Sequence, residues 1–299
     1  MQPRLQTWIL IAVTGWLTGC GTQHRAMEKL ESKIRQTLAE QEGVFAVAFT
    51  DLSTGRSLAI NDRDSFHAAS TMKTPVMIEL FRQATAGQLS LDDSVLLKNE
   101  FKSIVDGSPY SLDTTDDSEG DLYQHLGEKR SIRELIFRMI TVSSNFATNL
   151  LIEIAGPENV MKTIRGMGTL SMQVRRGVED DKAYQLGLNN TTTAHDLALL
   201  FRQIAEGKAV NPTASEDMTR ILLNQQFNEI IPAGVGPGAR VAHKTGWITG
   251  VSHDSGFVIL PDGRRYVLVI LSRGLKDEKS AINAMAQVSK MIYEFETQP

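Results

Sequence analysis

Hydrophobic positions divide the chain into two ends that contain strands and a long helical middle. Apolar residues at helical spacing predict an amphipathic helix over residues 24–41 and a closing helix from about Asp277 to Phe295. From about residue 70 to residue 230 the pattern is also helical, interrupted by polar loops. Strands are predicted where short apolar segments are bounded by turn residues, at Val44–Thr50, Arg56–Ile60, Arg240–Trp247, Asp254–Leu260 and Arg265–Leu271.

This order of elements predicts an α+β fold of the α/β sandwich type. Strands at both ends imply one antiparallel sheet built from both termini, with flanking helices and an inserted all-helical region. Residues 106–121, rich in Asp, Ser, Gly and Thr, are interpreted as a tolerated surface insertion. The alternative is a segment that shapes the entrance of a functional cleft. Residues 175–190 form a second polar stretch without a clear period.

The first residues have the pattern of a leader that directs export. Arg4 precedes a mostly apolar stretch that ends at Leu17-Thr18-Gly19-Cys20, and this stretch is too short to cross a bilayer as a helix. Residues 1–19 are therefore predicted to be a signal peptide. The run also resembles a bacterial lipobox, which implies lipidation of Cys20 and a membrane-anchored lipoprotein facing the periplasm or the cell exterior. An ordinary signal peptide followed by a chance cysteine is the alternative.

Composition narrows the candidate chemistry. The 299 residues include 31 Lys and Arg against 35 Asp and Glu, a net charge of −4 without a sustained basic run, which disfavours nucleic-acid binding. Cys20 is the single cysteine, so an internal disulfide and a cysteine-based structural zinc site are excluded. With Cys20 lipidated, the folded part has no thiol, and a serine becomes the natural candidate for a nucleophile.

The segment Ser70-Thr71-Met72-Lys73 is the first candidate for catalysis. Residues three apart share a face of a helix, so the Lys73 amine can reach the Ser70 hydroxyl and act as its base. Pro75 is tolerated only in the first turn of a helix, which predicts that this helix begins at about Ser70 with its positive dipole end beside the hydroxyl. Alone the pattern is weak, because such pairs are common on solvated helices.

The segment Ser143-Ser144-Asn145 is the second candidate, at the start of an apolar helical run. A serine at this place could pass a proton to a leaving group, and Asn145 could hold a substrate amide. An ordinary serine N-cap explains the same residues when they are taken alone.

The segment Lys244-Thr245-Gly246 is the third candidate, on a predicted strand with apolar neighbours. Lys244 and Thr245 could bind a carboxylate, and Gly246 allows the backbone to approach another segment closely. An exposed strand end is the alternative.

Each of the three motifs occurs once, in this order and on the expected type of element. Together they resemble the motif set of the penicillin-recognising serine enzymes, the class A β-lactamases and the penicillin-binding proteins. The resemblance covers about residues 26–297 and implies a class A-like catalytic domain with the α/β sandwich of that family.

The resemblance also implies a role for each motif residue. Ser70 would be the acylated nucleophile, Lys73 would help to deprotonate it, and Ser143 would relay a proton to the β-lactam nitrogen. The backbone N–H groups of Ser70 and Trp247 would form the oxyanion hole. The substrate is expected to be a β-lactam or a peptidoglycan-like molecule, with no metal or cofactor and a monomeric enzyme. Its acylamide side chain and its carboxylate would be bound by Asn145, Lys244, Thr245 and the adjacent Gly246.

The base that would release the acyl-enzyme is less clear from the sequence. Class A enzymes use a glutamate two residues after an arginine on an Ω-loop, whereas here Glu179 comes three residues after Arg176. Glu179 is the first candidate, and Asp180 and Asp181 are the alternatives. The motif at 143–145 also departs from the family, because Ser144 stands where class A enzymes usually have an aspartate, a change expected to loosen the local structure.

These departures leave three functions open. The first is a serine β-lactamase that works through an acylated Ser70, and the second is a D,D-peptidase or esterase of the same fold. The third, a non-catalytic penicillin-binding lipoprotein, is disfavoured by the presence of both Ser70 and Lys73. Arg240 and Arg273 are both candidates for a second contact to the substrate carboxylate. His243 and His253 are interpreted as packing residues of the strands, since Lys73 already supplies a base.

Overall fold

The computed structural model describes residues 16–298, and describes side chains from residue 25 onward. The signal peptide predicted over residues 1–19 lies almost entirely outside this part, as does the side chain of Cys20. Both therefore remain predictions. None of the helices in the described part of the chain is both long and apolar enough to cross a membrane.

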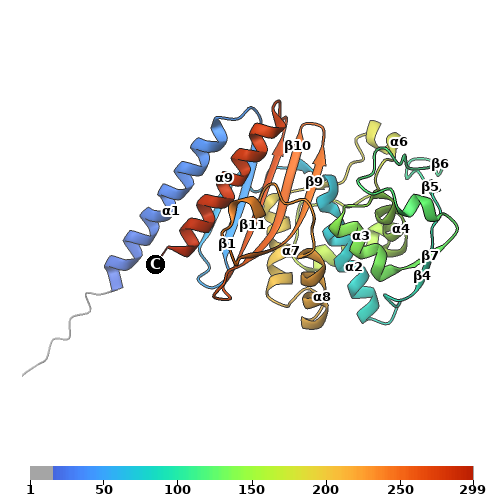
Figure 1. Cartoon of the computed structure of the whole chain (residues 1–299), viewed down its shortest axis with the longest axis horizontal. Helices are drawn as coiled ribbons and strands as arrows, with labels where there is room; N and C mark the ends of the chain where they lie inside the picture. The colour runs from blue at the N-terminus through green and yellow to red at the C-terminus, as the bar shows by residue number, and fades with distance from the viewer. Residues whose placement is uncertain (1–15, 299) are drawn as a thin grey trace, which may run out of the picture.

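Two groups of helices enclose a central sheet (Figure 1). The α-helices are α1 (Trp16–Ala39), α2 (Lys73–Thr85), α3 (Ile132–Thr141), α4 (Asn145–Ala155), α5 (Pro157–Gly166), α6 (Asp181–Gln185), α7 (Ala194–Ala205), α8 (Pro212–Leu222) and α9 (Glu278–Thr297). The short 3₁₀ helices are η1 (Ala69–Met72), η2 (Leu122–His125) and η3 (Pro232–Gly234).

The five strands of the main sheet come from both ends of the chain, as predicted. They lie in the order β2-β1-β11-β10-β9, and every neighbouring pair is antiparallel. Strand β9 is therefore at an edge, where alternate backbone N–H groups have no partner strand. The bounds are β1 (Val44–Asp51), β2 (Ser57–Ile60), β9 (Arg240–Ile248), β10 (Val251–Ile259) and β11 (Arg265–Arg273).

The inserted region is mainly helical but not all-helical, which corrects the prediction. Three short two-stranded sheets, β3·β8, β4·β7 and β5·β6, tie its loops together. Such short ladders leave no periodic apolar pattern, so the sequence does not reveal them. Their strands are β3 (Phe66–His67), β4 (Ser94–Leu96), β5 (Phe101–Lys102), β6 (Pro109–Tyr110), β7 (Lys129–Ser131) and β8 (Thr191–Thr192).

The sheet separates two apolar cores, because successive side chains of a strand point to opposite faces. In β1, Val47 and Phe49 pack under α1 and α9, whereas Ala46 and Ala48 face the helical region. Helix α1 begins earlier than predicted, at Trp16, and contributes the predicted apolar positions, among them Ile34, to the first core. The second core joins the other face of the sheet to the helical region.

Candidate active site

Ser70 lies where the helical region meets the edge strand of the sheet. It belongs to the 3₁₀ turn η1, which leads directly into α2, so the regular helix begins three residues later than predicted, at Lys73. The preceding residue, Ala69, has a φ of 43°, a conformation that costs energy for a residue with a side chain. This turn leaves Ser70 partly exposed while its neighbours are buried.

Gly246 allows edge strand β9 to approach this turn. A Cβ atom on Gly246 would lie 3.1 Å from the backbone nitrogens of Ser70 and Thr71, closer than side chains normally pack. The motif glycine is therefore required by the contact with the nucleophile turn. Trp247 follows it on β9 with its indole Nε1 donating to Glu278 at 2.9 Å.

Two adjoining cavities open onto Ser70. One has a volume of about 480 Å³ and also borders Ser143, Thr245 and Gly246. The other, of about 460 Å³, borders Glu179 and Arg176. Both are lined by Ser70, Asp116, Asn145 and Trp247, so they are two arms of one cleft.

The Lys73 ammonium group is fully buried and uses all three of its donor positions. It donates to the Ser143 carbonyl oxygen at 2.7 Å, to Ser143 Oγ at 3.2 Å and to Asn145 Oδ1 at 2.9 Å. Burial lowers the pKa of Lys73 to about 7, against the opposing charges of Asp117 and Glu179. A large fraction of Lys73 is therefore neutral at physiological pH, as a base must be. None of these three hydrogen bonds goes to Ser70, so the contact between Lys73 and Ser70 expected from their spacing stays a prediction.

Ser143 Oγ lies between two buried amines. It accepts from Lys73 Nζ at 3.2 Å and from Lys244 Nζ at 3.0 Å, and Ser143 itself adopts a φ of 58°. Burial and the neighbouring Lys73 hold the pKa of Lys244 well below its usual range. Ser144 caps α4 by accepting from Ala147 N at 3.2 Å, so the N-cap interpretation applies to this middle residue of the motif.

Among the acids that line the 460 Å³ arm, Glu179 is hydrogen-bonded to the motif residue Asn145. Its Oε1 accepts from Asn145 Nδ2 at 2.8 Å, and Asn145 Oδ1 accepts from Lys73, so one amide connects the carboxylate to the amine. Burial raises the pKa of Glu179, which has a φ of 59°. Positive φ at Ala69, Ser143 and Glu179 places strained backbone at three points of one cleft, as is common in active sites.

The two alternative acids are placed differently. Asp180 is buried and accepts from Ser103 Oγ and Ile104 N, both at 2.9 Å, and it also caps α6. Asp181 is exposed. Asp180 therefore serves the local structure, and only Glu179 reaches the polar network that includes Lys73.

Asn149 positions the Glu179 loop and was not identified from the sequence. Its side-chain oxygen accepts from Val178 N at 2.7 Å, and its Nδ2 donates to Val178 O at 3.1 Å. Gly177 lies so close to this amide that a Cβ would be 2.3 Å from Asn149 Oδ1. Asn149 is one helical turn beyond Asn145 on α4, and this i, i+4 spacing is the signal that could have indicated it.

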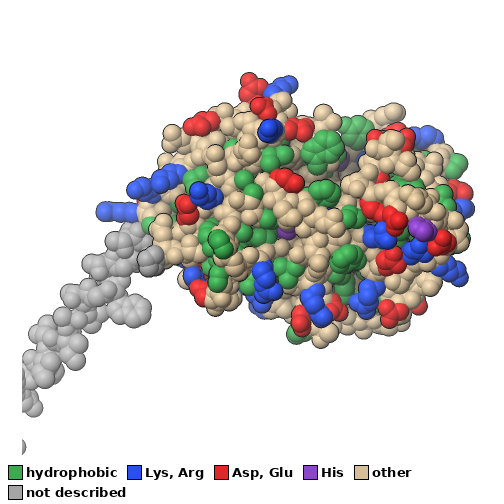
Figure 2. Space-filling view, viewed as in Figure 1, with side chains coloured by type: hydrophobic (Ala, Val, Ile, Leu, Met, Phe, Trp, Pro, Cys, Tyr) green, Lys and Arg blue, Asp and Glu red, His purple; other side chains and the backbone are tan. Residues whose placement is uncertain are grey.

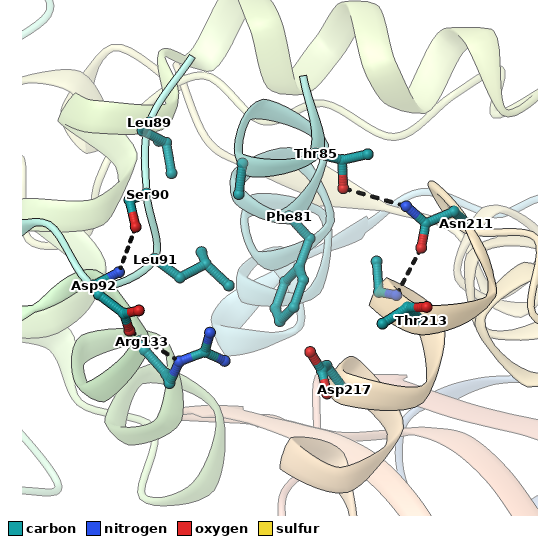
Figure 3. A pocket seen from close by; sticks show the side chains of 12 residues that line it. Phe81, Thr85, Leu89, Ser90, Leu91, Asp92, Arg133, Asn211, Thr213 and Asp217 are labelled. Carbon is teal, nitrogen blue, oxygen red and sulfur yellow. Dashed lines mark hydrogen bonds and ion pairs between the residues drawn. The ribbon is translucent and has the colours of Figure 1, made fainter. Parts of the chain in front are cut away.

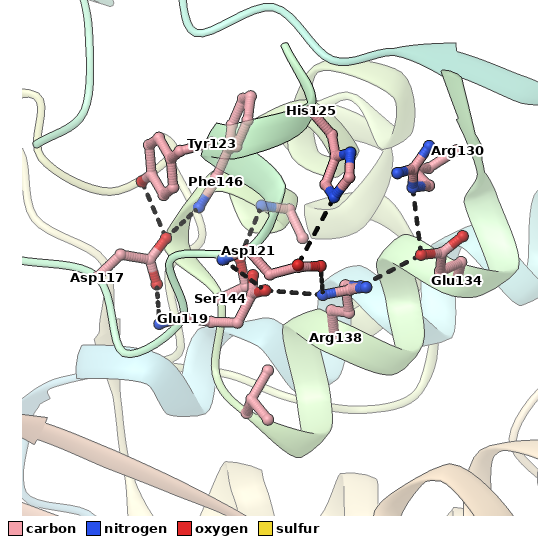
Figure 4. Close-up of polar contacts among 12 residues, drawn as sticks. Asp117, Glu119, Asp121, Tyr123, His125, Arg130, Glu134, Arg138, Ser144 and Phe146 are labelled. Carbon is pink, nitrogen blue, oxygen red and sulfur yellow. Dashed lines mark hydrogen bonds and ion pairs between the residues drawn. The ribbon is translucent and has the colours of Figure 1, made fainter. Parts of the chain in front are cut away.

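The segment 106–121 is part of the cleft wall, so its interpretation as a tolerated surface insertion was wrong. Asp117 accepts from the backbone nitrogens of Asn145 and Phe146, both at 2.9 Å, and from the Tyr123 hydroxyl at 2.9 Å (Figure 4). Ser118 Oγ donates to the Val142 carbonyl oxygen at 2.7 Å. Asp117 thus supplies a carboxylate to the α4 N-terminus, beside the position where Ser144 replaces the usual aspartate, and the expected loosening does not follow.

Replacing Asp117 by asparagine is expected to lower the free energy of unfolding by about 1–2 kcal/mol, because the helix N-terminus loses a charged acceptor. The pKa of Lys73 should also fall further, because Asp117 is the first of the two charges that raise it. Denaturant unfolding measures the first effect and the pH profile of acylation the second. The matched control is Asp116→Asn, whose exposed carboxylate caps no helix and whose removal should leave stability within about 0.5 kcal/mol. Equal stability of the two variants would contradict this role.

The histidines are buried and paired, in agreement with their interpretation as packing residues. His243 Nδ1 lies 2.8 Å from Asp254 Oδ1, and His253 Nε2 lies 2.9 Å from the His67 carbonyl oxygen. Burial lowers the pKa of His253 to about 4. His67, not singled out from the sequence, accepts from Ala69 N at 3.1 Å and so helps to hold the nucleophile turn.

Neither arginine considered for a second carboxylate contact lines the cleft. Arg240 is at the N-terminal end of β9, away from Trp247 at the other end. Arg273 donates to the Ser65 carbonyl oxygen, and its guanidinium group lies over the Phe66 ring. Spacing along the chain could not distinguish these positions, because the strand register decides which end of the sheet each arginine occupies.

A further cavity of about 330 Å³ lies between the C-terminal end of α2 and the N-terminal end of α8 (Figure 3). Its polar residues are paired with one another, for example Arg133 with Asp92 and Asn211 with Thr85. It contains none of the motif residues, so it is separate from the candidate active site. On the face seen in Figure 2, acidic and basic side chains are interspersed.

Comparison with known proteins identifies the family. The model of the beta-lactamase enzyme family matches residues 29–295. The chain is 22% identical over 291 residues to the extended-spectrum beta-lactamase PER-1 of Pseudomonas aeruginosa, covering 89% of this chain and 87% of that protein. It is 26% identical over 301 residues to a beta-lactamase of Bacteroides uniformis, covering 95% and 97%. The chain therefore belongs to the β-lactamase enzyme family, whose members are hydrolases that act on β-lactams.

Solved structures agree with this assignment. The beta-lactamase of Sphaerobacter thermophilus superposes with a TM-score of 0.77 at 26% identity, covering 90% of this chain and 98% of that chain. PBP-A superposes with a TM-score of 0.76 at 28% identity, covering 90% and 97%. A variant of PBP-A has been solved as an acyl-enzyme complex with penicillin G. The fold class predicted from the sequence, an α/β sandwich of the β-lactamase type, is confirmed.

Proposed function

We propose that the chain is a class A-like serine β-lactamase that opens the lactam ring through an acylated Ser70. The observation that carries the proposal is a chain of two hydrogen bonds beside Ser70, in which Lys73 donates to Asn145 and Asn145 donates to Glu179. This arrangement offers one base on each side of Asn145, one for forming the acyl-enzyme and one for releasing it. A penicillin-binding protein that only forms the adduct needs the first base but not the second.

In the proposed acylation step, Lys73 takes the proton of Ser70 Oγ as that oxygen attacks the lactam carbonyl carbon. The N–H groups of Ser70 and Trp247 stabilise the developing oxyanion, each contributing about 2.7–4 kcal/mol to the transition state. The lactam C–N bond then breaks, and Ser143 delivers a proton to the nitrogen and recovers one from Lys73, 3.2 Å away. Lys244 and Thr245 bind the substrate carboxylate, and Asn145 binds the acylamide.

In the proposed release step, Glu179 takes a proton from a water molecule that attacks the ester carbonyl carbon. The ester bond breaks, the product leaves as the acid, and Glu179 passes the proton that it took from water to Ser70 Oγ. The raised pKa of Glu179 makes its carboxylate a stronger base than an exposed glutamate. Turnover of nitrocefin tests the whole cycle, and an absence of turnover by fully acylated protein would reject it.

Acylation is expected to slow down as the pH falls through about 7. Only neutral Lys73 can accept the Ser70 proton, and its pKa is lowered to about 7, so its neutral fraction decreases below that pH and saturates above it. The measurement is the second-order rate constant of penicillin acylation between pH 5 and 9. A rate that is constant between pH 6 and 8 would argue against Lys73 as the base.

A D,D-peptidase is the second candidate, because the superposition with PBP-A is as close as that with the β-lactamase of Sphaerobacter thermophilus. Such an enzyme would acylate with penicillin but release it very slowly. Loss of the terminal D-alanine from a peptidoglycan pentapeptide, with little lactam turnover, would favour this candidate over the β-lactamase.

We also propose that the enzyme is exported and is held at a membrane by lipid on Cys20, because the N-terminal segment resembles a lipobox. Several acyl chains anchor a protein stably, and a β-lactamase acts where lactams reach the cell wall. Fractionation of cells that express the wild type or Cys20→Ser tests this proposal. An equal distribution of both forms between membrane and soluble fractions would reject it.

A further inference from the structure

The 480 Å³ arm of the cleft continues beyond Thr245 into an apolar recess. Its lining includes three elements far apart in the sequence: the loop after α8, the end of β9 with its neighbour β10, and the start of α9. We call the part of the cavity formed by these elements the distal recess. The residues that form it are Phe227, Glu229, Ile230, Trp247, Ser252 and Ile282.

Trp247 gives the recess an exposed aromatic wall. Its side chain is 63% exposed, yet its Nε1 donates to Glu278 Oε2, and Glu278 Oε1 accepts from Gly250 N at 2.7 Å. The indole is therefore held in place with its polar group already paired. A fixed, exposed aromatic ring at the border of a substrate cleft provides a flat apolar contact surface for a ligand.

Ser252 gives the recess an unused hydrogen-bonding group. It lies on β10 and pairs directly with Trp247 of β9, and only 3% of Ser252 is exposed. Its Oγ has no hydrogen-bonding partner within the described part of the protein. Ser252 therefore adds a small uncharged side chain to the wall of the recess.

The charges around this arm are of one sign. Asp116, Asp117 and Glu229 line it, whereas neither lysine nor arginine is among the described residues that do. Lys244 is buried beneath Thr245, where it donates to Ser143 and to the Thr245 carbonyl oxygen. The proposed function places one substrate carboxylate at Lys244 and Thr245, and a second anion farther out would meet the acidic groups that line this arm.

We propose that the distal recess binds an apolar, positively charged substituent of the substrate, next to the carboxylate held by Lys244 and Thr245. Phe227, Ile230 and Ile282 contact its apolar body, Trp247 lies against its face, and Glu229 faces its charge. An aromatic cation such as a pyridinium group has both properties. This inference rests on the proposed function, because it assigns a substrate preference to the same cleft.

Two cephalosporins form a matched pair of probes. Cephaloridine and cephalothin have the same acyl side chain but differ at the 3-position, where the first has a pyridinium group and the second a neutral acetoxy group. The measured quantity is the ratio of their kcat/KM values in the wild type and in each variant. Differences in the intrinsic reactivity of the two compounds cancel when the ratios are compared.

Glu229→Gln is expected to lower the cephaloridine-to-cephalothin ratio about three- to tenfold, with cephalothin changed less than about twofold. Ile282→Arg, which places a cation in the recess, should lower the ratio by at least about tenfold. Glu216→Gln is the matched control, because Glu216 is exposed on α8 and does not line the cleft. The cephaloridine-to-cephalothin ratio of this variant should equal that of the wild type.

The outcomes separate the inference from the proposed function. An unchanged ratio in both Glu229→Gln and Ile282→Arg, with either compound still reacting, would overturn the inference and leave the proposed function intact. If adducts form but persist, the same ratio is taken from the rates of adduct formation by mass spectrometry. If the wild type neither forms an adduct with either compound nor hydrolyses it, the proposed function is rejected, and the substrate preference with it.

Discussion

Ser70→Ala is expected to remove the covalent penicillin adduct and to lower β-lactam turnover by at least about 10⁴-fold, because the pathway through an acyl-enzyme depends on this hydroxyl. The fold should be unaffected, since Ser70 Oγ donates no hydrogen bond to another described side chain and the residue is partly exposed. Intact-protein mass spectrometry after mixing with penicillin G measures the adduct, and nitrocefin hydrolysis measures the turnover.

The hydroxyl of the other motif serine, Ser143, is buried between two amines, whereas Ser70 borders both arms of the cleft. An adduct of equal mass on the Ser70→Ala protein would therefore contradict the account and point to another nucleophile. The control is Ser171→Ala. Ser171 is exposed and lines neither arm, so turnover by this variant should stay within about twofold of the wild type.

Glu179→Gln is expected to acylate normally but to release the product about 10²–10⁴ times more slowly. The glutamine oxygen can still accept from Asn145 Nδ2, so the geometry around Lys73 is preserved while the basic group is lost. Single-turnover measurements separate the two steps. Nitrocefin in excess should give a burst of one equivalent, followed by very slow turnover.

Variants of the neighbouring acids test whether this effect belongs to Glu179 alone. Asp181→Asn changes an exposed carboxylate and should leave release unchanged. Asp180→Asn removes the charge that caps α6 and accepts from Ser103, so it is expected to cost about 1 kcal/mol of stability without abolishing release. Normal release by Glu179→Gln together with a block in Asp180→Asn would reverse the assignment.

The predictions that the structure confirms depend on patterns of residues that are close together in the sequence. Period-two and helical periodicity locate the strands of the main sheet and the closing helix to within a few residues, whereas α1 begins at Trp16 and not at the predicted residue 24. Each motif also predicts its own local structure: Pro75 lies in the first turn of α2, Ser144 caps α4, and Gly246 sits on the edge strand against the nucleophile turn. These features depend on residues within one turn or one strand, which a sequence displays directly.

The features that the sequence does not reveal depend on contacts between distant segments. Asp117 reaches α4 from 28 residues away, and Asn149 reaches Val178 from 29 residues away. Both use polar side chains in or against loops that have no periodic pattern. The shifted position of Glu179 is likewise understood only in three dimensions, where its positive φ accompanies the contact of its carboxylate with Asn145.

The positions of charged residues around the cleft also depend on contacts between distant segments. Arg240 and Arg273 are the arginines considered from the sequence, but Arg240 begins β9, Arg273 ends β11, and neither lines the cleft. The charges that do line the 480 Å³ arm are acidic and come from the loop 106–121 and the loop after α8. The preference for a cationic substituent therefore arises from residues that no motif contains.

The central claim is that Ser70 is acylated and that Glu179 then releases the acyl group. The most direct measurement is the mass of the full-length protein as a function of time after mixing with penicillin G, for the wild type and for Glu179→Gln. The account predicts a wild-type adduct that forms and disappears as the penicillin is consumed, and a persistent adduct on Glu179→Gln. A protein that is never modified, or an adduct that persists equally on both, would contradict it.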